Sequence, residues 1–394
     1  MCQADFLLKV ISNCLLYSKM KNEFDYLIIG QGLAGSILAY TLLEKGKKVL
    51  VLDEPKFQNC SKIAAGICNP ITGRNLVRTW KYKELFTFLN DFYPKLEKQF
   101  NQKFFFSVPI YRPFQTLEQQ QDWSAQEDKA TEEVIYPKDK AKYSFGENIN
   151  DPLGGLLIKN GGHLRTDIFL EAIKNYLIEK NAYQERFFDF DKLILNDTNQ
   201  DTTAKVVYQE IQANHIIFCR GIADKENPFF NKLPIAPAKG EILHIDFDRK
   251  EESVRKLNQI ILNKGCWLVP FHNYLNNKAR EVFTNSFRTG STYNHDDLTL
   301  EPTQEGREEI ESKLQAVLNL DYQITKQETG IRPSTRTRYP LMGTHINHSQ
   351  MSIFNGFGAK GVSMIPYFAQ EFVEYLFTGK ELDKIVRTDK WLNK

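Results

Sequence analysis

The stretch DYLIIGQGLAGSILAYTLLEKGKKVLVLDE, residues 25–54, decides the fold of this chain. YLIIG is a short apolar run that ends in glycine, a pattern typical of a buried parallel strand. GQGLAG then places Gly30, Gly32 and Gly35 in the spacing G-x-G-x-x-G. A helix follows until Gly46, and KVLVLD is a second strand. Strand, glycine loop, helix and strand together predict a dinucleotide-binding unit.

Each part of the glycine loop has a physical role in holding a diphosphate. Gly30 permits the tight turn, Gly32 lets a pyrophosphate approach the backbone, and Gly35 lets the helix pack close to the strand. The helix N-terminus, which includes Leu33 and Ala34, offers free N–H groups and a positive dipole end to phosphate.

Asp53 stands eighteen residues after Gly35, at the end of the second strand. A carboxylate at this position accepts hydrogen bonds from ribose hydroxyls. An aspartate here, with no arginine nearby, argues against NADP, but it does not distinguish NAD from FAD.

The bulk composition excludes several other classes. The 394 residues carry a net charge of +2 with acids and bases interleaved, so no basic stripe typical of nucleic-acid binders is present. None of the cysteines forms a C-x-x-C pair, and His and Asp in STYNHDD fit no metal-ligand spacing, so we expect no metal site. We expect free thiols in a reducing cytoplasm. The six cysteines are Cys2, Cys14, Cys60, Cys68, Cys219 and Cys266.

The start of the chain precedes the predicted first strand. Residues 1–23 contain apolar runs that Lys9 and Asn13 interrupt, which is too short and too broken for a membrane span. They also lack the basic start and the cleavage site of a signal peptide. We therefore expect residues 1–23 to be a disordered extension, of which residues 1–19 take no part in the fold.

The residue pattern of the chain changes after residue 235. The segments EILHIDF, QIILN, GCWLVPF and REVFTNSFRTG read as strands of a mainly antiparallel sheet. TQEGREEIESKLQAVLNL reads as a helix that lacks a capping box because position 306 is glycine, so Thr303 or Asp296 would cap it less ideally. A second glycine loop, NGFGAKG, precedes the last long helix.

Five short blocks, taken together, resemble the D-amino-acid-oxidase-like superfamily of FAD oxidoreductases. Beside the N-terminal unit, they are CSKIAAG (60–66), IIFCRG (216–221), AKGEIL (238–243), GIRPSTRTRYPLMG (330–343) and NGFGAKGVSMIPYFAQEF (355–372). The chain is similar to glycine and sarcosine oxidases and to the oxidoreductase domain of the bifunctional enzyme that modifies the wobble-uridine methylaminomethyl group of tRNA.

The resemblance implies an α/β fold in which a discontinuous Rossmann-like FAD-binding domain contains an inserted, mainly antiparallel α+β substrate domain. We expect residues 24–100, 160–235 and 328–394 to form the FAD-binding domain, and residues 101–159 and 236–327 to form the substrate domain. FAD is expected to bind non-covalently, because no cysteine lies in the C-terminal blocks. The expected cofactor-binding residues are Gly30, Gly32, Leu33, Ala34, Gly35, Asp53, Ser61, Ala65, Gly66, Gly221, Gly356, Gly358, Lys360 and Gly361.

The resemblance also implies substrate residues. Arg332 matches the family arginine that clamps a substrate carboxylate, and a guanidinium suits this role because its planar fork binds a carboxylate bidentately. The alternative is an internal ion pair. Trp267 and Tyr293 would line the substrate side or, alternatively, belong to the core. Lys360 is either a basic residue at the flavin or a solvated lysine.

The family comparison leaves three functions open. The first is oxidation of a C–N bond of a small amine or amino acid by hydride transfer to flavin N5. The second is oxidation of a modified tRNA base, which the net charge of +2 supports weakly. The third is non-catalytic flavin binding, because the family commonly has Asp at the position of Thr337 and Thr at the position of Arg220.

Overall fold

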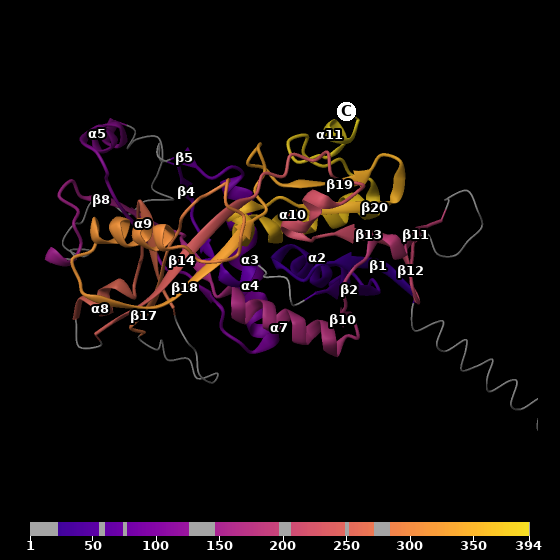
Figure 1. The fold of residues 1–394 in the computed structure, drawn as a ribbon, viewed down its shortest axis with the longest axis horizontal. Coiled ribbons are helices and arrows are strands. Elements are labelled where there is room, and N and C mark those ends of the chain that lie inside the picture. Colours follow the sequence, from indigo (N-terminus) through magenta and orange to yellow (C-terminus); the bar gives the residue numbers. More distant parts are fainter. Residues whose placement is uncertain are drawn as a thin grey trace, which may run out of the picture.

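The computed structural model describes residues 23–54, 60–73, 77–125, 146–196, 206–248, 252–271 and 284–393. Nearly all of the predicted N-terminal extension lies outside these ranges, together with Cys2 and Cys14. Figure 1 shows two halves along the long axis, one with a sheet flanked by helices and one rich in strands. None of the helices in the described ranges is long and apolar enough to cross a membrane.

The helix-flanked half is built on an eight-stranded sheet whose centre is parallel. Its main path runs β10-β2-β1-β13-β12-β11, and β20 pairs in parallel with β13 and antiparallel with β19. The strands are β1 (Glu23–Ile29), β2 (Val49–Asp53), β10 (Tyr183–Glu185), β11 (Leu193–Leu195), β12 (Val206–Tyr208), β13 (Ile211–Phe218), β19 (Leu341–His345) and β20 (His348–Asn355). The parallel strands bring segments from both ends of the chain to one sheet edge.

Four helices cover one face of this sheet: α2 (Leu33–Glu44), α4 (Tyr82–Phe100), α7 (Thr166–Glu179) and α10 (Gly361–Thr378). The apolar residues of α4 recur at helical spacing, since Leu85, Leu89, Tyr93 and Leu96 are all buried. The hydroxyl of Tyr93 donates to the carbonyl of Val362 at 2.8 Å, which joins α4 to α10. The first and last segments of the chain therefore share one core.

The strand-rich half is a seven-stranded sheet in the order β18-β14-β17-β16-β15-β7-β8. The strands are β7 (Ile110–Pro113), β8 (Gly155–Ile158), β14 (Ala238–Phe247), β15 (Ile261–Lys264), β16 (Cys266–Pro270), β17 (Ser286–Gly290) and β18 (Tyr322–Arg332). All pairs are antiparallel except β15 with β7. The outer face packs on α8 (Glu252–Leu257) and α9 (Gln304–Gln315). The predicted α/β fold class with an antiparallel second sheet is confirmed.

One of the expected segment limits, at residue 328, falls inside a regular element. β18 begins before residue 328 and ends after it, and β6 (Phe105–Phe106) pairs with β9 (Gly162–Leu164) across the expected boundaries. Strand pairing joins segments that lie far apart in the sequence, so a change of residue pattern along the chain does not mark where a domain ends. The remaining described elements are α3 (Cys60–Ile63), β3 (Ile67–Cys68), β4 (Ile71–Thr72), β5 (Val77–Arg78), α5 (Leu117–Ala125), α11 (Asp389–Leu392) and four short 3-10 helices, η2 (Gly146–Asn148), η3 (Phe190–Lys192), η4 (Gly221–Glu226) and η5 (Gly358–Lys360).

Candidate active site

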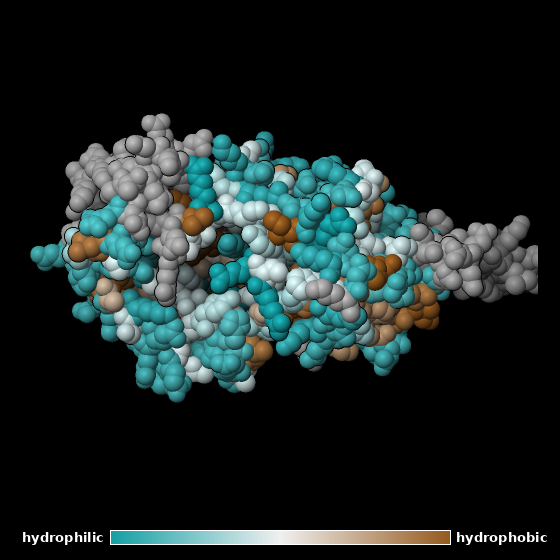
Figure 2. Space-filling view, turned by 90° about the horizontal axis from the view of Figure 1, so that it is seen from above, coloured by the Kyte–Doolittle hydropathy of each residue, from teal (hydrophilic) through white to brown (hydrophobic). Residues whose placement is uncertain are grey.

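A cavity of about 450 Å³ lies where the two halves meet. One wall is formed by the ends of β1 and β2, the start of α2 and the start of α10. The other wall is formed by β14, β16 and β18 of the second sheet. Figure 2 shows a hollow on the upper face near the junction of the halves. The cavity follows the rule that ligands of α/β sheets bind at the carboxyl ends of parallel strands.

The glycine loop forms the first wall by close backbone packing. Gly30 has a φ of 105°, and a Cβ there would lie 2.6 Å from the carbonyl oxygen of Cys219. A Cβ on Gly35 would lie 1.9 Å from the carbonyl oxygen of Gly30. Gly32 is the N-cap of α2 and has no side chain to cap the helix, and the first turn carries no acid. The start of α2 therefore suits a diphosphate, whose charge it can stabilise.

Asp53 lies beside this loop at the end of β2. Its Oδ1 accepts a hydrogen bond from the backbone N–H of Gln31 at 2.8 Å. Burial raises the pKa of Asp53, while the bond from Gln31 opposes this. The carboxylate lines the cavity and has a second oxygen for a ribose hydroxyl.

The second wall contains Arg332. A Cβ on Gly240 would lie 2.0 Å from Nη2 of Arg332, so the guanidinium passes directly over this glycine. The arginine Nη2 donates to Ser291 Oγ at 2.6 Å, and Nη1 donates to the carbonyls of Thr292 at 3.3 Å and Lys239 at 3.4 Å. The AKGEIL block thus has glycine at position 240 because the Arg332 side chain needs its space.

No carboxylate of the described residues lies within ion-pair distance of Arg332. Its three hydrogen-bond acceptors are all neutral, and burial lowers its pKa without an acid nearby. Tyr293 covers the guanidinium, with its ring centroid 5.4 Å from Cζ, and remains 58% exposed. No internal ion pair of Arg332 is therefore observed among the described residues, and its guanidinium remains a charged group at the cavity.

The C-terminal glycine loop reaches the same cavity. Gly358, Lys360 and Gly361 line it, and Lys360 is the N-cap of α10. Burial, and secondarily the charge of Arg338, lowers the pKa of Lys360. Lys360 is thus a half-buried cation at the cavity, which differs from a freely solvated lysine.

Two predicted cofactor residues do not line the cavity. Gly35 is buried between helix and strand, and Gly356, with a φ of 79°, has Thr335 Cγ2 only 2.7 Å from the place of a Cβ. Both allow close packing behind the wall. The predicted residues that do line it are Gly30, Gly32, Leu33, Ala34, Asp53, Ser61, Ala65, Gly66, Gly221, Trp267, Arg332, Gly358, Lys360 and Gly361. Tyr293 lies next to the cavity, over Arg332.

Several cavity residues were missed by sequence reasoning. Cys60, Arg186, Phe187, Phe188, Arg220, Asn263 and Ser291 all contribute to the lining. The only signal for Ser291 is its position directly after a strand that ends in glycine. Phe187 and Phe188 follow the short edge strand β10, which has no strong periodicity.

The cavity thiols are not poised for attack. Burial raises the pKa of Cys60 to about 11 and that of Cys219 well above its usual value. Both stay protonated at neutral pH, and the thiolate is the nucleophilic form. This chemistry supports the expectation of non-covalent FAD.

The two departures from the family pattern leave the arginine site intact. Arg220 lies over the ring of Phe190, 5.1 Å from its centroid, and lines the cavity. The hydroxyl of Thr337 lies 3.2 Å from that of Thr335 in a turn beyond β18. Neither residue appears among the hydrogen-bond partners of Arg332.

Two histidines that the sequence places in strands have polar side-chain partners. His215 bonds to Ser352 Oγ at 2.8 Å, and His244 bonds to Glu328 at 2.6 Å. Within the described ranges, no group of three or more metal-ligating side chains is present.

A glycine loop at a helix N-terminus faces an arginine with neutral hydrogen-bond partners across one cavity, which is an arrangement that suits a dinucleotide-binding enzyme. The family model described as FAD dependent oxidoreductase (DAO) matches residues 25–375, and the chain belongs to this family. Its cofactor is FAD, which fits the glycine cradle, the start of α2 and Asp53.

Known proteins similar to the chain differ in what they act on. The curated protein "tRNA 5-methylaminomethyl-2-thiouridine biosynthesis bifunctional protein MnmC" of Leptospira interrogans is 26% identical over 343 residues, 80% of this chain and 47% of that protein. The chain thus spans about half the length of this relative.

Solved structures show the same fold at low identity. Iminodiacetate oxidase from Chelativorans sp. BNC1 superposes with a TM-score of 0.71 at 18% identity, covering 93% of this chain and 98% of that one. Glycine oxidase from Bacillus cereus ATCC 14579 has a TM-score of 0.69 at 17% identity, covering 94% and 100%.

Proposed function

We propose that this protein oxidises a C–N bond of a small amine or amino acid that carries a carboxylate. The observation that supports this most is the partly buried Arg332 guanidinium, which lies in the FAD cavity with neutral acceptors only. Partial burial of a charge without a counter-ion is unfavourable, and a substrate carboxylate would supply the missing partner.

The chain's residues position the substrate for this reaction. Arg332 binds the carboxylate, which places the neighbouring C–H and nitrogen in the cavity. When bound, FAD supplies the hydride acceptor at its N5 atom. A hydride leaves the C–H bond and a C=N bond forms, after which water adds and the C–N bond breaks. The products are an amine or ammonia, an oxo acid and reduced cofactor, which dioxygen or another electron acceptor reoxidises.

A second candidate is a modified base in tRNA. The curated relative is named for tRNA modification, and its match covers 80% of this chain. Lys360 and Arg338 interact electrostatically beside the cavity, and Tyr293 exposes 58% of its surface over Arg332. Cations and an exposed aromatic ring suit a nucleotide as well as an amino acid.

Anaerobic flavin bleaching separates the three functions. The purified, FAD-loaded protein is mixed with glycine, sarcosine, iminodiacetate or bulk tRNA, and the oxidised flavin band is followed. We expect bleaching by at least one of the carboxylated amines. Bleaching by tRNA alone would establish the second candidate, and no bleaching by any of them would support non-catalytic flavin binding.

A further inference from the structure

One loop supplies the surroundings of Arg332. It runs from Ser291 to Thr303 and joins β17 to α9. Its start provides the Ser291 hydroxyl and the Thr292 carbonyl as acceptors for the guanidinium, and Tyr293 covers it. Any movement of this loop would therefore move the hydrogen-bond partners of the arginine.

The loop is held by the buried ammonium of Lys239. This side chain is 1% exposed, and its Nζ donates to Asp297 Oδ2 at 2.5 Å, to Thr299 Oγ1 at 3.2 Å and to the carbonyl of Glu301 at 2.7 Å. The backbone of Lys239 also exchanges two hydrogen bonds with Asn294, at 2.7 and 3.0 Å. A buried cation with three acceptors from one loop fixes that loop firmly, because loosening it would leave the charge unpaired.

Glu241, two residues along β14, holds the far end of the same loop. Its carboxylate accepts from the Thr303 backbone at 2.8 Å and from the Thr303 hydroxyl at 2.7 Å, and it lies 3.8 Å from Lys239 Nζ. Thr303 in turn caps α9 by accepting from the Gly306 N–H at 3.0 Å. A Cβ on Gly306 would lie 2.6 Å from Glu241 Cδ, so the glycine leaves room for a carboxylate from another strand. Glu241 thereby occupies the place of a capping-box acid.

Lys239 connects this network to Arg332 without lining the cavity. Its carbonyl accepts from Arg332 Nη1 at 3.4 Å, while its side chain belongs to the outer face of β14 with Glu241. Alternation along a strand places residues 239 and 241 on one face and Gly240 on the other.

We infer that Lys239 is a positioning residue for the carboxylate clamp, acting through the Ser291–Thr303 loop. This inference rests on the proposed role of Arg332. The buried ammonium keeps the loop in the one arrangement that presents neutral acceptors to the guanidinium and leaves its remaining donors to the substrate.

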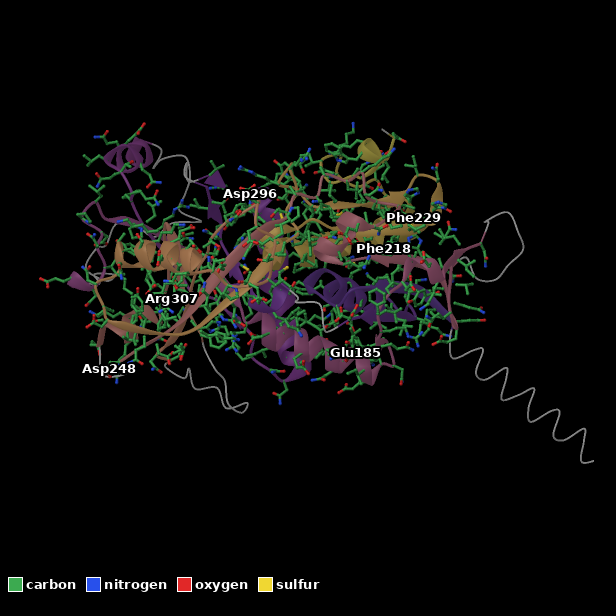
Figure 3. The ribbon with its side chains drawn as sticks, viewed as in Figure 1. Glu185, Phe218, Phe229, Asp248, Asp296 and Arg307 are labelled. Atoms are coloured by element: carbon green, nitrogen blue, oxygen red, sulfur yellow. The ribbon has the colours of Figure 1, made fainter. Side chains whose placement is uncertain are left out.

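A matched pair of neighbouring residues tests this inference. Asp297→Asn removes the charge of the carboxylate nearest to Lys239 Nζ, whereas Asp296→Asn makes the same charge change at the adjacent position, whose side chain is not among the hydrogen-bond partners of Lys239. Figure 3 shows Asp296 at the junction of the two halves. Sodium acetate serves as the carboxylate probe, and its Kd is read from the flavin absorbance of the FAD-loaded full chain. FAD content and Tm are measured on each variant.

We expect D297N to weaken acetate binding about tenfold, with D296N equal to the wild type and FAD retained in both. K239M should weaken it further, and D297N alone decides if K239M does not fold. The KM for whichever amine bleaches the flavin should rise in D297N with little change in kcat. A merely structural role would lower Tm and FAD content without changing the acetate Kd.

The variant Arg332→Leu separates failure of the inference from failure of the proposed function. If R332L loses acetate binding but D297N equals D296N, the role of Lys239 is overturned and the clamp stands. If R332L binds acetate as the wild type does, or the wild type shows no acetate response, the clamp itself is wrong and the role of Lys239 falls with it.

Discussion

Nη2 of Arg332, at the end of β18, lies 2.6 Å from the hydroxyl oxygen of Ser291, which directly follows β17. A hydroxyl orients the guanidinium without neutralising it, whereas a carboxylate would cancel its charge. The Arg332 guanidinium therefore keeps its charge in a cavity whose opposite wall is a dinucleotide-binding loop. This arrangement, more than any single motif, supports the proposed oxidation of carboxylated amines.

Replacing Arg332 should affect substrate binding and leave the cofactor in place. Hydrogen bonds to charged groups contribute about 1.5–3 kcal/mol each, so R332L should raise the KM for a carboxylated amine about 100-fold. Steady-state kinetics and FAD content measure the two effects. Arg336→Leu is the control, because Arg336 is exposed on the turn beyond β18. Equal KM values for the two variants would refute the clamp.

Gly35 in the first loop and Gly46 after the end of α2 should differ sharply in their tolerance of a methyl group. Gly35→Ala places a Cβ 1.9 Å from the Gly30 carbonyl oxygen, and we expect this to cost about 3 kcal/mol or more and to release FAD. Gly46→Ala meets nothing within 4 Å and has only its φ of 76° to strain, which costs about 1–2 kcal/mol. Denaturant unfolding and flavin content compare the two. A G35A variant as stable as G46A would contradict the packing described here.

Asp53 should contribute to cofactor affinity. Its carboxylate orders the Gln31 N–H of the loop at 2.8 Å, so D53A removes both this bond and the predicted ribose contact. We expect the Kd for FAD to rise about 10- to 100-fold, as measured by quenching of flavin fluorescence. Glu185→Gln is the control at the edge of the same sheet, where Figure 3 labels Glu185. An unchanged Kd in D53A would argue against ribose binding.

Acid should weaken the second sheet through Glu328. The hydrogen bond from His244 lowers the pKa of Glu328 from 4.5 to about 2. A lowered pKa means that the stabilisation is complete above pH 4.5 and is lost as the pH falls toward 2. With solvent screening, E328Q should lower the free energy of unfolding by about 1 kcal/mol at pH 6. The two proteins should converge near pH 2, and a constant difference across this range would rule out the mechanism.

The sequence predicts the parts of the site that depend on local spacing. Gly30, Gly32 and Asp53 follow from one strand–helix–strand unit, and Arg332 follows from a short block that resembles a family. The hydrogen-bond partners of Arg332 were not predictable from the sequence. An isolated β-bridge between Lys239 and Asn294 brings two segments together that are far apart in the sequence, and local spacing gives no sign of such a contact. One signal was present in β14, where Lys239 and Glu241 continue the alternating face of Leu243 and Ile245 and are buried with it.

The expected domain limits and the cytoplasmic location stay predictions. Strand β18 passes through the expected limit at residue 328 because the strand must carry Arg332 from the second sheet to the cavity. A long strand that reaches from the second sheet to the cavity shows no break in its own sequence. Changes in the residue pattern along the chain therefore reveal the order of the segments better than the residues at which each segment ends.

The most direct measurement mixes the FAD-loaded protein anaerobically with iminodiacetate, glycine and sarcosine, and compares flavin bleaching in wild type and R332L. We predict that at least one of these substrates bleaches the wild-type flavin and yields one oxo acid per flavin reduced. R332L should bleach only at much higher substrate concentration. Flavin that stays oxidised with all three substrates, or bleaching that does not depend on Arg332, would contradict the account.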